Sequence, residues 1–285
     1  MDIRKPDFAG SWYPGRKSEC LMAIEDFSKS LIPCPTPNGE NIGGIVPHAG
    51  WYYSGQIAYN VIHCMRSDNI PDVIVLFGRH LYPGSGNYIM KEGAWGTPLG
   101  ELKIEQDLAG KLALEFPFTI ETPFDHEPDN TIELQLPFIK YLFPDTKILP
   151  IGVPPASMSI GIGERVAEIA KSMGLEVLFL GSTDLTHYGP NYGNTPKGVG
   201  PQAVKWVKNE NDRRMVDLML DMDPEGVLSE ALKNSNACCA GAVAAAIAAA
   251  KSIGARKSEK LIYRTSHDVR PDSSFVGYAG IIYQR

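Results

Sequence analysis

The segment Val73-Ile74-Val75-Leu76-Phe77 is a short apolar run that ends in Gly78-Arg79-His80. A run of this length, rich in β-branched residues and bounded by glycine, is typical of a buried β-strand. Two further runs have the same form: residues 42–46 lead to His48, and residues 175–180 lead to Asp184 and His187. Ligands bind beyond the carboxyl ends of the strands in an open α/β sheet. The three runs therefore predict that three of the six histidines converge on one pocket, as a metal site or as an acid/base site.

Stretches with the periodicity of amphipathic helices lie between the apolar runs. We expect strands at residues 42–46, 73–77, 147–153, 175–180, 260–265 and 275–283, and helices at 55–65, 105–116, 131–143, 163–173, 204–222, 224–233 and 239–251. Thr131 is the expected cap of its helix. This alternation predicts an α/β fold with a largely parallel or mixed central sheet flanked by helices. Because no internal repeat or low-complexity linker divides the chain, we expect one domain spanning residues 1–285.

The composition is that of an ordinary globular protein of 285 residues with a net charge of −6. With 27 basic and 33 acidic side chains and no long basic run, non-specific binding to nucleic acid is not expected. Ala240–Ala250 is the longest stretch of low polarity, and a membrane span needs about 20 residues. The five cysteines form neither a C-x-x-C pair nor a disulfide-type spacing, which favours a reducing compartment. The N-terminus lacks the apolar core of a signal peptide, so we expect a cytoplasmic protein with no membrane partner.

His48 and His80 are the first two candidates for metal ligands. Pro47, Ala49 and Gly50 keep side-chain bulk away from His48, although a histidine that only fixes the turn through hydrogen bonds fits equally well. His80 stands between the apolar run and a Pro-Gly-Ser-Gly loop, and taken alone it is consistent with a surface histidine. Arg79 is unusual beside a metal site because a cation repels the ion. Its side chain either points away or grips an anionic substrate group through paired hydrogen bonds.

Asp184, His187 and Cys238 complete the set of candidates. The D-x-x-H spacing allows a carboxylate to hold an imidazole for general acid/base catalysis, whereas in the alternative Asp184 only caps a helical turn. Cys238 precedes a helix that Ser235 and Asn236 are able to cap, and a helix N-terminus lowers the pKa of a thiol. Cys239 is adjacent, and we expect only one of the two cysteines to face a given pocket. The alternative for both is a small core residue in a tightly packed alanine-rich helix.

Motifs of several large enzyme classes are missing from the chain. It has no G-x-x-x-x-G-K-[ST] phosphate loop, no complete G-x-G-x-x-G dinucleotide fingerprint and no H-E-x-x-H zinc motif. It also lacks the G-x-S-x-G elbow of the α/β-hydrolases. The candidate chemistry therefore rests on the histidines, the carboxylate and the cysteines.

Five segments, in order along nearly the whole chain, resemble the Memo family, whose prokaryotic members are called AmmeMemoRadiSam system protein B. The signature P-H-A-G-[YW]-x-Y-S-G is matched by residues 47–55, and the S-S-D-[FL]-S-H-[YW]-G turn is similar to residues 182–189. Three other segments resemble the family's opening, its S-[IL]-E-V-Q-L-P-F helix and its closing strand: residues 4–14, 131–138 and 276–279.

The resemblance implies a fold like that of the class III extradiol dioxygenases, in which two histidines and a carboxylate bind Fe(II). Memo-like proteins place a cysteine where the carboxylate would be. By this resemblance the metal ligands are His48, His80 and Cys238, with Fe(II) as the expected ion and copper or zinc as competitors, since a thiolate softens the site. It further implies His187 as the acid/base histidine with Asp184 as a pocket carboxylate, and Trp12 as an aromatic wall of the substrate pocket. Trp51 and Arg79 are the other residues that we expect to bind substrate. Eukaryotic members are linked to iron or copper binding and to signalling through phosphopeptides, and the prokaryotic name implies a functional link to a radical SAM protein and an AMMECR-like protein.

The chain departs from the family pattern at three points. Phe77-Gly78-Arg79-His80 replaces the family's G-P-N-H, and Asp129-Asn130-Thr131 replaces E-H-S. Cys238-Cys239-Ala240-Gly241-Ala242 replaces C-G-Y-G-P, which favours Cys238 as the ligand and leaves Cys239 as the alternative. Three hypotheses follow: a metal-dependent redox enzyme acting on a small molecule, a non-catalytic module that binds a phosphorylated or carboxylated ligand or peptide, and an enzyme with a cysteine nucleophile.

Overall fold

The computed structural model describes residues 1–35 and 41–285. Its centre is a mixed β-sheet in the order β10-β12-β2-β9-β3-β8-β4-β7, with β11 paired to β12. The four inner strands are all parallel: β2 (Asn41–Val46), β9 (Val177–Ser182), β3 (Val73–Gly78) and β8 (Lys147–Gly152). The outer strands are β4 (Asn87–Met90), β7 (Phe118–Glu121), β10 (His187–Tyr188), β11 (Lys257–Thr265) and β12 (Phe275–Gln284). The predicted α/β class and mixed central sheet are confirmed.

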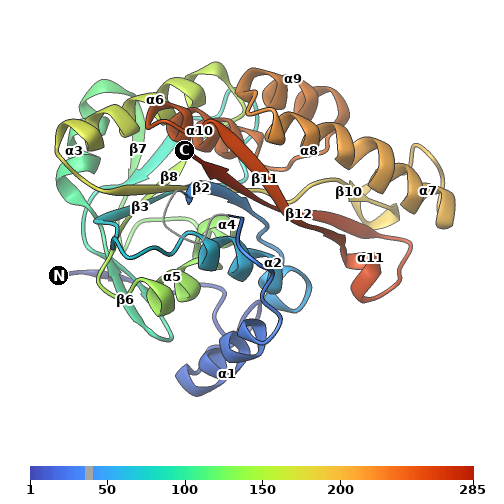
Figure 1. Cartoon of the computed structure of the whole chain (residues 1–285), viewed down its shortest axis with the longest axis horizontal. Coiled ribbons are helices and arrows are strands. Elements are labelled where there is room, and N and C mark those ends of the chain that lie inside the picture. The colour runs from blue at the N-terminus through green and yellow to red at the C-terminus, as the bar shows by residue number, and fades with distance from the viewer. Residues whose placement is uncertain (36–40) are drawn as a thin grey trace.

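Helices cover both faces of this sheet (Figure 1). On one face lie α3 (Gln106–Glu115), α6 (Ser157–Ser172), α8 (Asp212–Leu220), α9 (Pro224–Asn234) and α10 (Ala240–Ser252). On the other lie α1 (Lys17–Ser28), α2 (Trp51–Cys64), α4 (Asn130–Glu133) and α5 (Leu136–Leu142). Alternate side chains of a strand point to opposite faces. Val75 of β3 accordingly packs in the first helical layer, and Leu76 packs in the second.

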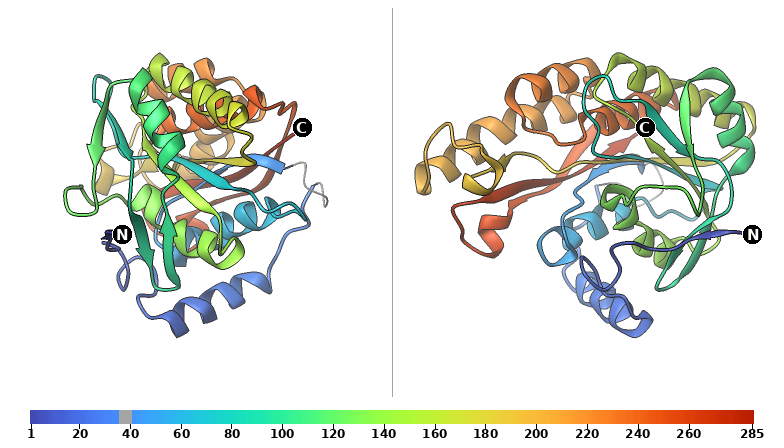
Figure 2. Two further views of the ribbon diagram at one scale, coloured as in Figure 1. Left: turned by 90° about the vertical axis from the view of Figure 1, so that its left-hand side faces the viewer. Right: turned by 180° about the vertical axis from the view of Figure 1, so that it is seen from behind.

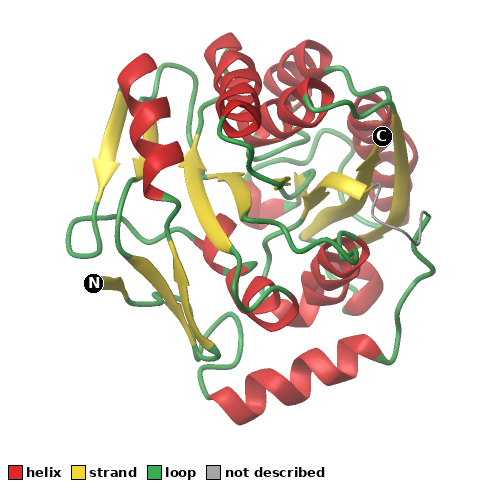
Figure 3. Cartoon of the chain, turned by 60° about the vertical axis from the view of Figure 1, so that its left-hand side comes forward, coloured by secondary structure: helices red, strands yellow, loops and turns green. Residues whose placement is uncertain are grey.

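Two features lie outside this three-layer arrangement. A small sheet of β1 (Ile3–Arg4), β5 (Ala94–Thr97) and β6 (Gly100–Lys103) forms near the N-terminus (Figure 3). At the far end of the molecule, α7 (Pro201–Trp206) continues through a π-helical turn, η2 (Val207–Asn211), into α8 (Figure 2). The short elements η1 (Pro190–Tyr192) and α11 (Ser266–Val269) lie beside β10 and β12. The small sheet, α1, β4 and β7 were not predicted, because their apolar runs are too short to give a clear period. One domain over residues 1–285 stays a prediction.

The helix expected at residues 131–143 is wrong as a single element, because the chain forms α4 and α5 with a break at Leu134 and Gln135. Thr131 is not the cap either. Asp129 is the N-cap residue, and its carboxylate accepts a hydrogen bond from the backbone N–H of Thr131. Pro137 lies in the first turn of α5, where a missing N–H costs least. The apolar period of this segment therefore continues across a break that its proline helps to create.

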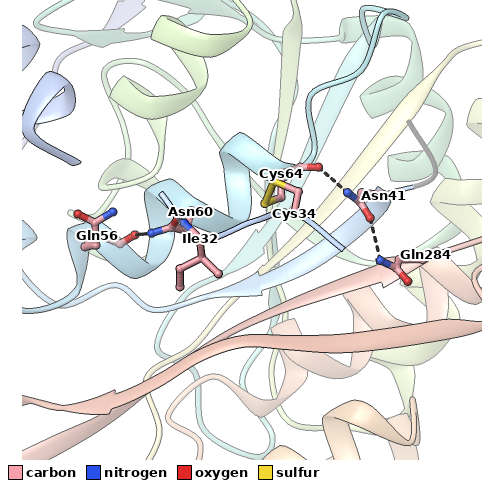
Figure 4. The surroundings of a disulfide bond; sticks show 7 residues. All are labelled: Ile32, Cys34, Asn41, Gln56, Asn60, Cys64 and Gln284. Atoms are coloured by element: carbon pink, nitrogen blue, oxygen red, sulfur yellow. Dashed lines mark hydrogen bonds between the residues drawn. A yellow bond between two sulfur atoms is a disulfide. The ribbon is translucent and has the colours of Figure 1, made fainter. Parts of the chain in front are cut away.

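The spacing of the cysteines did not indicate a disulfide, but Cys34 and Cys64 form one (Figure 4). This bond ties the segment after α1 to the end of α2. The Cys64 carbonyl accepts a hydrogen bond of 2.6 Å from the side chain of Asn41, at the start of β2. Cysteines separated by 30 positions give no local pattern, so only the packing of α2 identifies the pair. In the part of the chain that the structure describes, every helix is too short or too polar to cross a bilayer.

Candidate metal centre

The carboxyl ends of β2, β9 and β3 lie side by side at one edge of the sheet. Val46 is level with Ser182 across the β2–β9 pair, and Phe77 is level with Gly181 across the β3–β9 pair. His48 and His80 each follow two residues after a strand, so the structure brings them together on either side of the β9 end. Their ring centroids are 4.8 Å apart and their planes are nearly perpendicular.

The surroundings of His48 fix both its backbone and its tautomer. Its N–H donates to the carboxylate of Asp184 at 2.8 Å, and its carbonyl accepts from the side chain of Asn130 at 3.1 Å. The ring Nδ1 lies 2.9 Å from the hydroxyl oxygen of Ser182, which donates its own proton to the carbonyl of Thr131. Nδ1 must therefore be the donor in this pair. Such an outer hydrogen bond leaves Nε2 to face a metal ion, and here Nε2 faces the cysteines.

Cys238 and Cys239 lie in the loop between α9 and α10, and the β9 end holds both. The N–H of Cys238 donates to the Asp184 carbonyl at 3.1 Å, and the N–H of Cys239 donates to the Thr183 hydroxyl at 3.1 Å. The expectation that only one cysteine faces the pocket is wrong, because both sulfur atoms reach the histidines. Ser235 and Asn236 are not caps of α10 either, since that helix begins at Ala240 with Cys239 as its N-cap residue.

Four donor atoms converge at this point. His48 Nε2 lies 3.2 Å from Cys238 Sγ, His80 Nδ1 lies 3.6 Å from Cys239 Sγ, and the two sulfur atoms are 3.8 Å apart. One ligand atom from each of the four residues fits within a span of 4.8 Å. Metal–nitrogen bonds of about 2.0 Å and metal–sulfur bonds of about 2.3 Å in a tetrahedron place the donors roughly 3.3–3.8 Å apart. The observed spacings suit a common ion, so the four side chains are able to hold one.

The two thiols differ in acidity although both are buried. Burial alone would raise the pKa of Cys238, but hydrogen bonds and the nearby charge from Cys239, His48 and His187 hold it well below its ordinary value. Burial and the neighbouring Cys238 sulfur raise the pKa of Cys239 well above its ordinary value. Burial would lower the pKa of His48, yet the negative charges of Asp184 and Cys238 raise it to about 9. The interaction between these two side chains therefore favours the thiolate form of Cys238 and the imidazolium form of His48.

His187 lies at the start of β10 with its ring turned toward the same cluster. Its Nε2 is 3.9 Å from a carboxylate oxygen of Asp184 and has no hydrogen-bond partner among the described residues, although the atom is buried. Burial would lower the pKa of His187, but Asp184 and Cys238 raise it to about 10. Asp184 and Cys238 therefore favour the charged form of the His187 ring at the edge of the cluster.

A cavity of about 650 Å³ opens beside Cys238 and His187. Most of its walls are apolar, with Leu185 and Leu232 among them, and its polar lining residues include Tyr192, Asn194 and Ser235. No Lys, Arg, Asp or Glu stands among its lining residues, all of which belong to the described part of the chain. A small molecule bound there touches the Cys238 and His187 end of the cluster.

The chain is similar over nearly its whole length to proteins of one family. The family model described as Memo-like protein matches residues 4–282. A MEMO1 family protein of Pyrococcus abyssi is 34% identical to this chain, and the match covers 99% of this chain and 100% of the relative. The chain belongs to the Memo family. MEMO1 family proteins of Thermococcus onnurineus and Methanococcoides burtonii are 32% and 33% identical, over at least 98% of both chains. Among solved structures, the uncharacterized protein JW3007 of Escherichia coli K12 matches with a TM-score of 0.48 and 12% identity, over 85% of this chain and 99% of that one.

The two tryptophans that we expected to bind substrate lie apart from the cavity. The Trp51 ring is only 4% exposed, stacks on Phe138 at 4.1 Å and donates from Nε1 to the Leu134 carbonyl. Trp12 is 42% exposed and meets Phe8 edge-on. Neither tryptophan lines the cavity beside Cys238.

Arg79 also takes a different place from the one expected of an anion anchor. Its buried guanidinium pairs with Glu121 at 2.5 Å and Glu127 at 2.9 Å, and it lies over the ring of Tyr88. Of the two alternatives open for Arg79, the structure has the side chain pointing away from the cluster. Two carboxylates and the face of one aromatic ring already contact the guanidinium in this structure.

Sequence reasoning missed several residues that shape the site. Cys239 was taken only as a substitute for Cys238, and the hydroxyl of Ser182 was not linked to the tautomer of His48. Asn130 stands where the family motif has a histidine, and its amide instead supports the His48 carbonyl. The Memo motifs around residues 131 and 182 were the available signal, because they mark segments that meet only in the folded chain.

Proposed function

We propose that this Memo-family protein is a metal-dependent oxidoreductase that acts on a small molecule in the cavity beside Cys238. His48, His80 and Cys238 hold the ion, and Cys239 supplies a further sulfur within reach. The convergence of four soft and borderline donors within 4.8 Å is the observation that carries the proposal. Two imidazoles and a thiolate suit iron, copper or zinc better than magnesium or calcium, and we propose Fe(II) as the working ion.

The protein's own groups prepare this binding. Ser182 leaves His48 Nε2 directed at the cluster, and its neighbours hold the pKa of the Cys238 thiol well below its ordinary value, which favours the thiolate. The thiol proton of Cys239 is harder to remove, so Cys238 is the first sulfur to bind. With three ligands the ion keeps an open position for a substrate, whereas a fourth protein ligand closes the site. Bound there, the ion would act as a Lewis acid and, as iron or copper, would exchange electrons with the ligand.

His187 is the proposed proton-transfer residue. Its Nε2 is buried between Asp184 and the cluster, and the ring lines the cavity. Asp184 keeps the imidazole charged and oriented, while its other interactions hold the backbone of His48 and the loop of Cys238. One carboxylate residue therefore supports both the metal ligands and the acid/base group.

The cavity favours an uncharged ligand over an anionic one. Its lining has no lysine or arginine, and Arg79 is paired with Glu121 and Glu127. A phosphate or carboxylate group would lie near Asp184 and Cys238, and those two groups already balance the charges of His48 and His187, so no unpaired cation remains to attract it. A planar or aliphatic molecule with one or two hydroxyl groups matches the apolar walls. A functional link to a radical SAM protein and an AMMECR-like protein, and a cytoplasmic location, stay predictions.

Metal analysis of anaerobically purified protein is the first test. After exposure to Fe(II) and removal of excess ion, we expect about one iron per chain in the wild-type protein and in His267→Ala, whose histidine bonds the Asp272 carbonyl outside the cluster. His48→Ala is expected to lose the ion. Wild-type protein that retains no iron, copper or zinc would overturn the proposal.

Ligand binding and turnover form the second test. Phenol, benzoate and phenyl phosphate share one ring and differ in charge, and we expect ligand-observed NMR to detect phenol alone on the metal-free protein. Oxygen uptake by the iron-loaded protein with catechol is expected to fall about 100-fold or more in His187→Ala. Tight binding of phenyl phosphate would favour a non-catalytic anion-binding module, and selective alkylation of one cysteine that abolishes a metal-free activity would favour a cysteine nucleophile.

A further inference from the structure

The helix that runs from α7 to α8 contains the π-helical turn η2 (Val207–Asn211) next to the candidate site. In this turn the N–H of Asp212 donates to the carbonyl of Val207, five residues earlier. The wider turn changes which side chains face inward, and π-turns within α-helices are frequent at functional sites. Here two consecutive polar residues, Asn211 and Asp212, are both almost fully buried.

Asp212 and Asn211 hold the turn that precedes His187. The carboxylate of Asp212 accepts hydrogen bonds from both the N–H and the hydroxyl of Thr186, the N–H bond being 3.0 Å long. Its second oxygen accepts from the hydroxyl of Tyr263 at 2.7 Å. The side chain of Asn211 donates to the same Thr186 hydroxyl at 2.9 Å. Thr186, the neighbour of His187, is therefore held by three buried hydrogen bonds from one helix.

The same turn holds the loop that carries Cys238. The side chain of the fully buried Asn236 donates to the Asn211 carbonyl at 2.7 Å. The Asn211 amide also donates to the carbonyl of Asn234 at 3.3 Å. Asn211 is thus bonded to both segments, with 25 positions separating it from Thr186 and 25 from Asn236.

From this arrangement we propose that Asn211 and Asp212 are positioning residues that join the His187 turn and the Cys238 loop into one unit. The contacts meet at the end of the π-turn: the Asn211 carbonyl accepts from Asn236, and the side chains of Asn211 and Asp212 both bond Thr186. The role attributed to His187 and Cys238 rests on the proposed function, but the mechanical coupling of the two segments does not.

The cost of breaking the network gives the size of the expected effect. A buried polar group that loses its partner costs about 1–3 kcal/mol. A cost of this size makes local opening roughly 5- to 150-fold more frequent. Because the two segments share Asn211, removing a bond to either one is expected to open both.

Hydrogen–deuterium exchange of the metal-free protein tests the coupling directly. Asn236→Ala removes a bond on the Cys238 side, and we expect at least about tenfold faster exchange in residues 184–188 as well as in residues 234–239. Asp212→Asn removes the negative charge and replaces one of the two acceptor oxygens by an NH2 group with almost no change in shape. The bonds to Thr186 and Tyr263 lose their charge assistance, and we expect faster exchange in both segments again. Asn209→Ala, at an exposed position of the same turn, and Asp217→Asn, at an exposed position of α8, are the matched controls and leave both segments unchanged.

Exchange confined to the mutated side in both variants would overturn the proposal. A second readout is the affinity for Co(II), which we expect to fall about 10- to 100-fold in Asp212→Asn and to stay within twofold of wild type in Asp217→Asn. If the wild-type protein binds no metal, the proposed function fails while the exchange experiment still decides the coupling. If Asp212→Asn does not fold, Asn236→Ala alone carries the test.

Discussion

The Nε2 atom of His48 lies 3.2 Å from the sulfur of Cys238, although 190 positions separate the two residues. The contact forms because the β9 end holds both partners: the Asp184 carboxylate accepts from the backbone of His48, and the Asp184 carbonyl accepts from the backbone of Cys238. A single residue between two strands therefore sets the spacing of two proposed ligands.

Replacing each cysteine separately is expected to rank the two sulfurs. Cys238→Ser should weaken Co(II) or Zn(II) binding by at least about 100-fold, because it removes the thiol whose pKa is lowered and which loses its proton more easily. Cys239→Ser should weaken it by no more than about tenfold, since this thiol keeps its proton more strongly. Competition with a chromophoric chelator measures both affinities. The reverse order, with Cys239 dominant, would contradict the assignment of Cys238 as the first sulfur ligand.

Metal binding is expected to depend on pH through His48. The pKa of His48 is raised to about 9, so below pH 9 the ion must displace a proton from Nε2. The apparent affinity should therefore rise about tenfold per pH unit between pH 7 and 9 and level off above pH 9. Calorimetry in two buffers with different ionisation enthalpies measures the protons released. Release of no proton at pH 7 would show that His48 is neutral before the ion binds.

Gly78 is expected to be indispensable for placing His80. A Cβ atom at Gly78 would lie 2.2 Å from the hydroxyl oxygen of Thr131, which accepts the Arg79 N–H at 2.6 Å. Gly78→Ala should lower the free energy of unfolding by about 2–3 kcal/mol and weaken metal binding. Gly110→Ala is the control: a Cβ there meets nothing within 4 Å, and alanine favours the helix α3 by up to about 1 kcal/mol. Urea unfolding measures the free energy of unfolding of both variants. A value for Gly78→Ala equal to that of the wild-type protein would contradict the steric argument.

The Cys34–Cys64 disulfide is expected to stabilise the protein measurably. Closing a loop of about 30 residues lowers the entropy of the unfolded chain by an amount worth about 3–4 kcal/mol. Cys34→Ser should show this loss in urea unfolding, and a reductant should bring the wild-type protein to the same level. Cys20→Ala, which alters a thiol outside the disulfide, should keep its sensitivity to reductant. Wild-type stability that does not respond to reductant would contradict the prediction.

The sequence predicted much of the central fold because its signals are local. The apolar run of β3 and the similar runs of β2 and β9 identify buried strands without reference to the rest of the chain. Once those strands are parallel neighbours, residues placed just after them share one edge, which is why His48 and His80 were expected together. The Memo signatures supplied the cysteine, which no local pattern marks as a ligand.

Other features were wrong or missing because they depend on contacts between distant residues. The apolar period of residues 131–143 does not reveal the break before α5, and the spacing of Cys34 and Cys64 does not reveal their bond. From the sequence, Arg79 beside His80 was expected to bind an anion. In the folded chain its guanidinium instead bonds Glu121 of β7 and Glu127 of the following loop, both more than 40 positions away.

Sequence signals alone identified the inner strands of the central sheet with β11 and β12, most helices, the family and the positions of two histidines at strand ends, since hydrophobic periodicity and short motifs act over a few neighbouring residues. The folded chain was needed to show that Cys239 lies beside Cys238 in the cluster, that Ser182 sets the tautomer of His48, and that Asn211 bonds both the His187 turn and the Cys238 loop. Those outcomes depend on hydrogen bonds and close packing between segments that lie far apart along the chain.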